Sequence, residues 1–244
     1  MDPEIVVHPD ADALAEALAS ELTAALAALQ RAGRVPQLCL TGGRIATRAY
    51  ARLASDGAGA VDWSGVELWW GDDRFVPADD DDRNAKQVLD LIRAPLGLDP
   101  ARVHEMPASD GGLDLDAAAA AYAAELDGTG FDICLLGLGP DGHVASLFPD
   151  HPSAHTPGTV IAVRDSPKPP PLRTSVTFEV INRSREVWFL VSGAEKAEAA
   201  ARALLRTGPE PVPGARVEAR ERTLWLMDTA ATAQLPGTVE LRRA

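Results

Sequence analysis

The chain has 244 residues, of which 46% are hydrophobic, so it can bury the core of a folded domain. Its 36 acidic residues outnumber its 23 Lys and Arg residues, and a net charge of −13 without a basic stripe excludes a nucleic-acid-binding protein. No apolar run is long enough to cross a membrane, and the acidic residues 1–4 do not resemble a signal peptide, so we expect a cytoplasmic protein with neither a membrane nor a nucleic-acid partner.

Helical and strand patterns alternate along the chain. In chain order, the expected elements are a strand at 5–7, a helix at 14–29 capped by Asp10, a strand at 37–40, a helix at 45–53, a strand at 66–70, a helix at 84–91, a strand at 103–106, a helix at 114–126, strands at 131–136, 175–178 and 187–191, a helix at 194–205, a strand at 223–227 and a short helix after residue 228. This alternation predicts an α/β fold with a mostly parallel sheet covered on both faces. We find no internal repeat and no linker, which favours one domain over residues 1–244.

Three predicted strand ends carry loops with chemically useful residues, at 41–44, 71–74 and 137–143. In a parallel sheet the carboxyl ends of the strands lie at one edge, so the three loops are expected to share one site.

The loop at 137–143 follows a buried strand and contains Asp141 and His143, and a stretch of helical character follows it at 146–148. A neutral histidine oriented by a carboxylate can take a proton from water, so these two residues are the catalytic candidates. The alternative is structural, with Asp141 capping a helix and His143 packing.

Gly42 and Gly43 precede a predicted helix, where backbone N–H groups can hold a phosphate, although an ordinary strand–helix turn has the same composition. Arg74 can reach an anion from the neighbouring strand end or pair with the adjacent aspartates. Lys168 and Arg173 flank a proline-restricted loop that either holds them over the site or is a stiff surface loop.

Two other kinds of site are not supported. The glycines of 137–142 match a dinucleotide fingerprint only formally, because the match lies on a late strand and contains a proline. The spacing of His143, His151 and His155 fits no standard metal site.

The segment at 134–149 resembles the signature of the 6-phosphogluconolactonase family. Further resemblance lies at 71–77 with Asn84, at 166–170 with Arg173, and at 187–193 with Lys196, in the order expected for that family.

The resemblance implies a Rossmann-like α/β/α sandwich that hydrolyses 6-phosphogluconolactone without a metal, a cofactor or a covalent intermediate. His143 would be the base that activates water, and Asp141 would orient it. The residues that would hold the phosphate and the other substrate oxygens or support that contact are Gly42, Gly43, Arg44, Asp72, Arg74, Asn84, Lys168 and Arg173.

The chain departs from the family pattern at three places. Arg44, Ile45 and Ala46 replace the usual Ser-Thr-Pro, so Arg44 would supply a charge where two hydroxyls are missing. Asp73 replaces the usual Glu, and Arg83 occupies a position that is often Ser.

Two alternative functions belong to the same fold. A glucosamine-6-phosphate deaminase would carry Ala-Phe-Asn-Glu-Pro where this chain has Ala-Ser-Leu-Phe-Pro at 145–149, and a non-catalytic sugar-phosphate sensor would carry an extra DNA-binding segment. Both comparisons favour the lactonase, acting on a small phosphorylated substrate as a monomer or small homo-oligomer.

Overall fold

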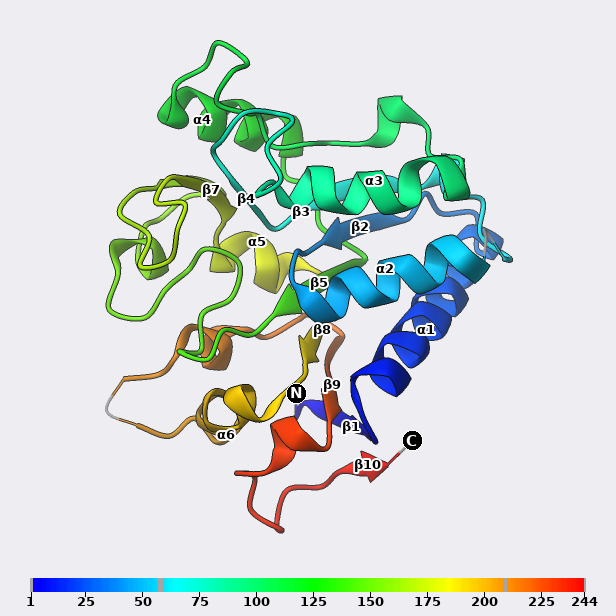
Figure 1. Cartoon of the computed structure of the whole chain (residues 1–244), viewed down its shortest axis with the longest axis vertical. Helices are drawn as coiled ribbons and strands as arrows, with labels where there is room; N and C mark the ends of the chain where they lie inside the picture. The colour runs from blue at the N-terminus through cyan, green and yellow to red at the C-terminus, as the bar shows by residue number, and fades with distance from the viewer. Residues whose placement is uncertain (1, 57–58, 209, 244) are drawn as a thin grey trace.

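A seven-stranded parallel sheet organises the chain in the computed structural model, which describes residues 2–56, 59–208 and 210–243 (Figure 1). The strand order is β10-β1-β9-β8-β5-β2-β3, and neighbouring strands are parallel. The strands are β1 (Glu4–His8), β2 (Gln37–Leu40), β3 (Glu67–Trp70), β5 (Ile133–Gly137), β8 (Glu186–Val191), β9 (Arg222–Asp228) and β10 (Arg242–Arg243).

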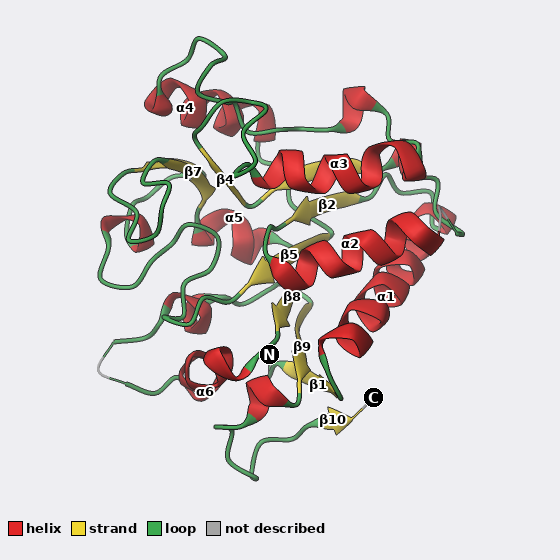
Figure 2. Ribbon diagram, viewed as in Figure 1, coloured by secondary structure: helices red, strands yellow, loops and turns green. Residues whose placement is uncertain are grey.

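Helices cover both faces of this sheet (Figure 2). The α-helices of the described segments are α1 (Ala11–Arg31), α2 (Arg44–Asp56), α3 (Asn84–Leu96), α4 (Leu115–Leu126), α5 (Phe178–Arg183) and α6 (Ala197–Leu205). α1, α2 and α3 lie side by side on one face, and α4, α5 and α6 contribute to the core on the other.

Successive strand residues point into two different cores, as the pleat of a strand requires. In β8, Phe189 packs into the core shared with α4, α5 and α6, whereas Trp188 and Leu190 pack against α1 to α3. Burial on both faces explains why the strands are continuous apolar runs. The predicted α/β fold with helices on both faces of a mostly parallel sheet is confirmed.

α1 shows how local sequence sets an element. The Asp10 carboxylate accepts hydrogen bonds from the backbone N–H groups of Asp12 (3.0 Å) and Ala13 (2.9 Å), which confirms the predicted cap. The leucines at helical spacing, from Leu14 to Leu26, are buried against the sheet, and each contributes about 2 kcal/mol of apolar burial.

A second, three-stranded antiparallel sheet was not predicted. It contains β4 (Asp72–Arg74), β7 (Arg173–Val176) and β6 (Val160–Val163), in the order β4-β7-β6. The Val176 N–H donates to the Gly71 carbonyl at 2.9 Å, so this sheet is attached where β3 ends. It therefore places the proline-rich loop near the carboxyl edge of the parallel sheet.

Several local predictions were wrong. The expected strand at 103–106 is a single bridge between Val103 and Leu68, and the loop expected at 71–74 contains the strand β4, Asp72–Arg74. The expected strand at 175–178 ends at 176 because a helix starts at Phe178. No helix follows His143: Ala145 has a φ of 48°, and the Ser146 N–H donates to the Ser175 hydroxyl instead of a helical carbonyl.

Candidate active site

The site lies where the topology of the parallel sheet reverses. From β2 the chain continues to β3 on one side, whereas from the adjacent β5 it continues to β8 on the other. Open α/β sheets bind ligands in this crevice, outside the carboxyl ends of the strands. A cavity of about 190 Å³ opens there, and its lining residues are Thr41, Gly42, Gly43, Asp72, Arg74, Asn84, Gly137, Leu138, Gly139, Pro140, His143, Ala145, Lys168, Arg173 and Lys196.

His143 and Asp141 form a hydrogen-bonded pair at the cavity wall. His143 Nδ1 lies 2.6 Å from Asp141 Oδ1, and Lys168 Nζ lies 3.3 Å from the same oxygen and 3.0 Å from Nδ1. An ammonium group only donates and an ionised carboxylate only accepts, so the cluster is satisfied when Nδ1 carries a proton and both donors share Oδ1. In the neutral imidazole, this assignment places the free lone pair on Nε2, which can accept a proton from water.

The environment keeps Asp141 ionised. Burial alone raises the pKa of this carboxyl, but the hydrogen bond and electrostatic attraction of the His143 ring, together with the charge of Lys168, outweigh burial and hold the pKa well below its ordinary value. The imidazole is also packed against Phe148, with 4.8 Å between ring centroids. The ring orientation is thus fixed by one polar and one apolar contact.

Glycines allow this pair to form. A Cβ at Gly139 would lie 1.9 Å from His143 Nδ1 and 2.4 Å from Asp141 Oδ1, so a side chain at 139 would displace both residues. Gly142 has a φ of 87° and lies against Val212, where a Cβ would be 2.6 Å from the valine Cβ. The tight turn therefore requires glycine at both positions.

Arg173 holds Lys168 over the pair. This arginine is 4% exposed, and its Nε donates to the Pro170 carbonyl at 3.1 Å. Its Nη2 donates to the carbonyls of Lys168 (2.9 Å) and Pro169 (3.1 Å). The Arg173 guanidinium therefore both lines the cavity and holds the loop at 168–170 by hydrogen bonds to its carbonyls. The sequence did not indicate this second, structural role.

Positive charge accumulates in the cavity, whose cations are Arg74, Lys168, Arg173 and Lys196. Arg74 and Arg173 are directly opposite each other in the β4–β7 pair, an arrangement that costs free energy unless an anion offsets it. The Nε of Arg74 is buried and has no partner among the described residues. In a chain with a net charge of −13, this local excess of cations suits an anionic ligand.

Asp72 and Asn84 line the cavity beside the glycine loop at 42–43. Ser146 Oγ donates to Asp72 Oδ2 at 2.7 Å, and Asn84 Nδ2 donates to the Asp72 carbonyl at 3.0 Å. A Cβ on Gly42 would lie 2.0 Å from Asn84 Oδ1, so this close approach requires glycine. The two polar residues thus position the glycine loop at the cavity wall.

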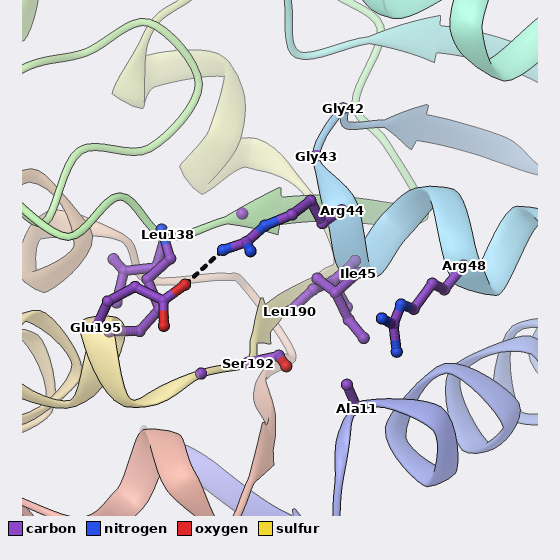
Figure 3. Close-up of a pocket in the computed structure, with 13 residues that line it drawn as sticks. Ala11, Gly42, Gly43, Arg44, Ile45, Arg48, Leu138, Leu190, Ser192 and Glu195 are labelled. Atoms are coloured by element: carbon purple, nitrogen blue, oxygen red, sulfur yellow. Dashed lines mark hydrogen bonds and ion pairs between the residues drawn. The ribbon is translucent and has the colours of Figure 1, made fainter.

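Arg44 lies apart from these groups. It lines a neighbouring cavity of about 380 Å³ that shares Gly42, Gly43 and Lys196 with the first. Its guanidinium forms an ion pair with Glu195 across this cavity (Figure 3). Among the residues expected to bind substrate, the structure brings all but Arg44 to the lining of the first cavity, together with His143, while Asp141 lies behind the histidine.

Lys196 was not singled out from the sequence as a site residue. Burial, followed by the charge of Lys168, lowers the pKa of its ammonium group, which faces the cavity without a carboxylate partner among the described residues. The available signal was its position after β8, a fourth strand that ends at the same edge. Ser146, which holds Asp72, gave no such signal.

The described segments contain no helix that is long and apolar enough to span a membrane. Nor do the described residues contain a group of three or more His, Cys, Asp and Glu side chains placed to hold a metal ion.

A family model described as glucosamine-6-phosphate isomerases/6-phosphogluconolactonase matches residues 9–225. The chain belongs to this family. It is 47% identical to a 6-phosphogluconolactonase of Streptomyces coelicolor, covering 96% of this chain and 95% of the relative, and 44% identical to one of Mycobacterium tuberculosis, covering 97% and 100%.

Solved structures of the family agree with the fold. The 6-phosphogluconolactonase of Thermotoga maritima is 26% identical, with a TM-score of 0.82 over 92% of this chain and 99% of that one. A monomeric glucosamine-6-phosphate deaminase reaches a TM-score of 0.78 at 20% identity, over 94% and 99% of the two chains. Because the family's fold accommodates both reactions, the side chains of the site must decide between them.

Proposed function

We propose that the chain hydrolyses 6-phospho-D-glucono-1,5-lactone to 6-phosphogluconate, a step of the oxidative pentose phosphate pathway. The observation that carries the proposal is the His143–Asp141 hydrogen bond at the wall of a cavity lined by four cations. Full-length relatives named 6-phosphogluconolactonase, at 44–47% identity, support the same substrate.

The reaction begins when Nε2 of His143 takes a proton from water as the water oxygen attacks the lactone carbonyl carbon. The carbonyl oxygen becomes negatively charged, and the cations that line the cavity stabilise this charge. The tetrahedral intermediate collapses, the bond between carbonyl carbon and ring oxygen breaks, and the imidazolium returns its proton to the ring oxygen. Asp141 stabilises the imidazolium between these two transfers.

The cations bind the charged end of the substrate. Arg74, Arg173 and Lys196 offer N–H donors to phosphate oxygens, and the backbone at Gly42 and Gly43 lies beside them. Holding the phosphate there fixes the lactone ring relative to His143, which converts attack by water into a positioned step.

The proposed reaction involves no nucleic acid. We infer that one domain acts in the cytoplasm on a free small molecule, because the net charge of −13 opposes polyanion binding and four cations line the small cavity.

The test offers freshly prepared 6-phosphogluconolactone and glucosamine 6-phosphate in parallel, each with a protein-free blank because the lactone also opens spontaneously. We expect acid release above the blank from the lactone and no ammonia from the amino sugar. Ammonia release without lactone opening would replace the proposal with the deaminase.

A further inference from the structure

A buried ion pair lies behind the cavity wall and has no part in the steps above. Asp73 is 1% exposed and Arg83 is 2% exposed, with 3.4 Å between Oδ2 and Nη2. The same Nη2 donates to the Met106 carbonyl at 2.7 Å. The Nε and Nη1 atoms of Arg83 are buried without a hydrogen-bond partner among the described residues. Glu105 Oε2 lies 3.9 Å from Nη2, farther than Asp73 Oδ2, so Asp73 is the nearer of two carboxylates that compensate this charge.

Asp73 caps the start of α3, although it lies well before the helix in the sequence. Arg83 occupies the N-cap position of the helix but makes no capping hydrogen bond with its side chain. Instead, Asp73 Oδ1 accepts the backbone N–H of Asn84 at 2.7 Å, and Oδ2 accepts that of Ala85 at 3.2 Å. A carboxylate at this place satisfies N–H groups that a helix start otherwise leaves unpaired.

The same carboxylate also fixes β4. Asp73 Oδ1 accepts the backbone N–H of Arg74 at 2.8 Å, so one oxygen joins the backbone of this cavity cation to Asn84, the first residue of α3. Asn84 then packs directly against Gly42. Arg74, Asn84 and Gly42 all line the cavity, which means that the buried pair sets the relative position of three parts of its wall.

Asp73 and Arg83 are two of the positions noted in the sequence as departures from the expected family pattern, and the structure places their side chains in contact.

We propose that Asp73 and Arg83 form a coupled pair of positioning residues that set Arg74 and Asn84 at the phosphate end of the cavity. The inference rests on the proposed function for the identity of the substrate, but the coupling itself concerns anion binding. Removing either partner leaves a buried charge uncompensated, whereas removing both does not. The effects of the two changes are therefore expected to be non-additive.

The experiment compares wild type with Asp73→Asn, Arg83→Met and the double variant, with Lys86→Met as the control. Lys86 is a cation on the same helix that pairs with Asp81 and Asp90 at the surface. We expect KM for the lactone to rise about tenfold in each single variant with kcat within about twofold, because the His143 cluster is untouched. In the double variant, the fold-increase in KM over wild type is expected to be smaller than the product of the fold-increases in the two single variants. The KM of the control is expected to match that of wild type.

Thermal unfolding shows whether each variant is folded at the assay temperature. Arg83→Lys, which keeps the charge, is expected to stay within about threefold of the wild-type KM. Folded single variants with wild-type KM, losses confined to kcat, or effects that multiply independently in the double variant would each overturn the inference.

Calorimetric titration with inorganic phosphate separates this inference from the proposed function. If wild type does not open the lactone, the proposed function is wrong, and phosphate affinity then decides the inference. Phosphate binding about tenfold weaker in the single variants supports it, and unchanged binding overturns it.

Discussion

At the scale of single residues, the site depends on which nitrogen of His143 holds a proton. Asp141 and Lys168 both approach Nδ1, and the cluster is satisfied only if the carboxylate accepts from both. In the mechanism that we propose, Nε2 of the neutral ring is then the base. The chemistry follows from the order of donors and acceptors around one ring.

Replacing His143 with alanine is predicted to lower kcat by about two to four orders of magnitude, because general-base assistance is lost while the cations remain. Steady-state kinetics on fresh lactone measure the effect. His155→Ala is the matched control, since His155 is exposed and outside the cavity lining. A kcat within a few-fold of wild type would remove His143 from the mechanism.

Lys196→Met is predicted to raise KM about tenfold with little change in kcat, as expected when binding common to substrate and transition state is lost. The methionine keeps most of the side-chain volume and removes the charge. Lys86→Met serves as the control, because Lys86 pairs with Asp81 and Asp90 at the surface. An unchanged KM would show that Lys196 does not contact the substrate.

At the scale of elements, short connections decide which side chains meet. The turn at 139–143 presents His143 only because its glycines permit close approach, and the β4–β7 pair aligns two arginines at the cavity. Asp73 links β4 to the start of α3. These contacts involve backbone geometry as much as side-chain chemistry.

Gly139→Ala is predicted to lower kcat at least tenfold, because the new Cβ would overlap His143 Nδ1 and force the ring away from Asp141. Gly237→Ala provides the control, since no atom lies within 4 Å of a Cβ there. Kinetics and thermal unfolding are measured together. Wild-type kcat in a folded Gly139→Ala protein would contradict the geometry of the turn.

Asp73 gives the stability of the protein a pH dependence with a defined sign. Burial raises its pKa from 3.8 to about 6, against the opposing influence of Arg83 and three backbone N–H groups. Between pH 4 and 6 the folded state therefore binds more protons than the unfolded state, so this group's contribution is present below pH 4 and is lost as pH rises through 6.

We predict that the free energy of unfolding of wild type, relative to Asp73→Asn, falls by about 3 kcal/mol between pH 4 and pH 7. Urea unfolding at several pH values measures the difference. The charged or titratable groups near Asp73 are common to both proteins, and they are Asp72, Arg74, Arg83, Glu105, Tyr122 and Arg173. A difference that is independent of pH would show that Asp73 does not titrate in this range.

At the scale of the whole molecule, a strongly acidic chain concentrates positive charge at one edge of its sheet. The loops after β2, β3, β5 and β8 converge there because parallel strands end on the same side. The antiparallel sheet then adds the loop that carries Lys168. Ligand binding should consequently stabilise the folded chain.

We predict that 6-phosphogluconate at about 100 times its Kd adds about 2.7 kcal/mol to the free energy of unfolding and raises Tm by several degrees. At the same ligand concentration, the increase in Tm should persist in His143→Ala and should be smaller in Lys196→Met. Thermal unfolding with and without the ligand measures it. An equal shift in both variants would argue against separate roles for the base and the cation.

Much of the fold followed from patterns in the sequence. Apolar runs at 37–40 and 187–191 are buried strands, and the leucine spacing after Asp10 is a capped helix. The segment at 175–178 shows the limit, because its alternating pattern is divided between the end of a strand and the start of a helix. Tertiary pairing with β4 and β6 decides that boundary, and local propensity does not contain it.

The site divides in the same way. By itself, the sequence determined that three loops with glycines, acids and cations follow buried strands, because apolar periodicity and parallel topology are local signals with one geometric outcome. Only the tertiary structure decided that Lys196 joins the cavity, that Arg44 faces Glu195, and that Asp73 meets Arg83. Those contacts join residues from separate elements, and their formation depends on the direction in which each side chain leaves the packed fold.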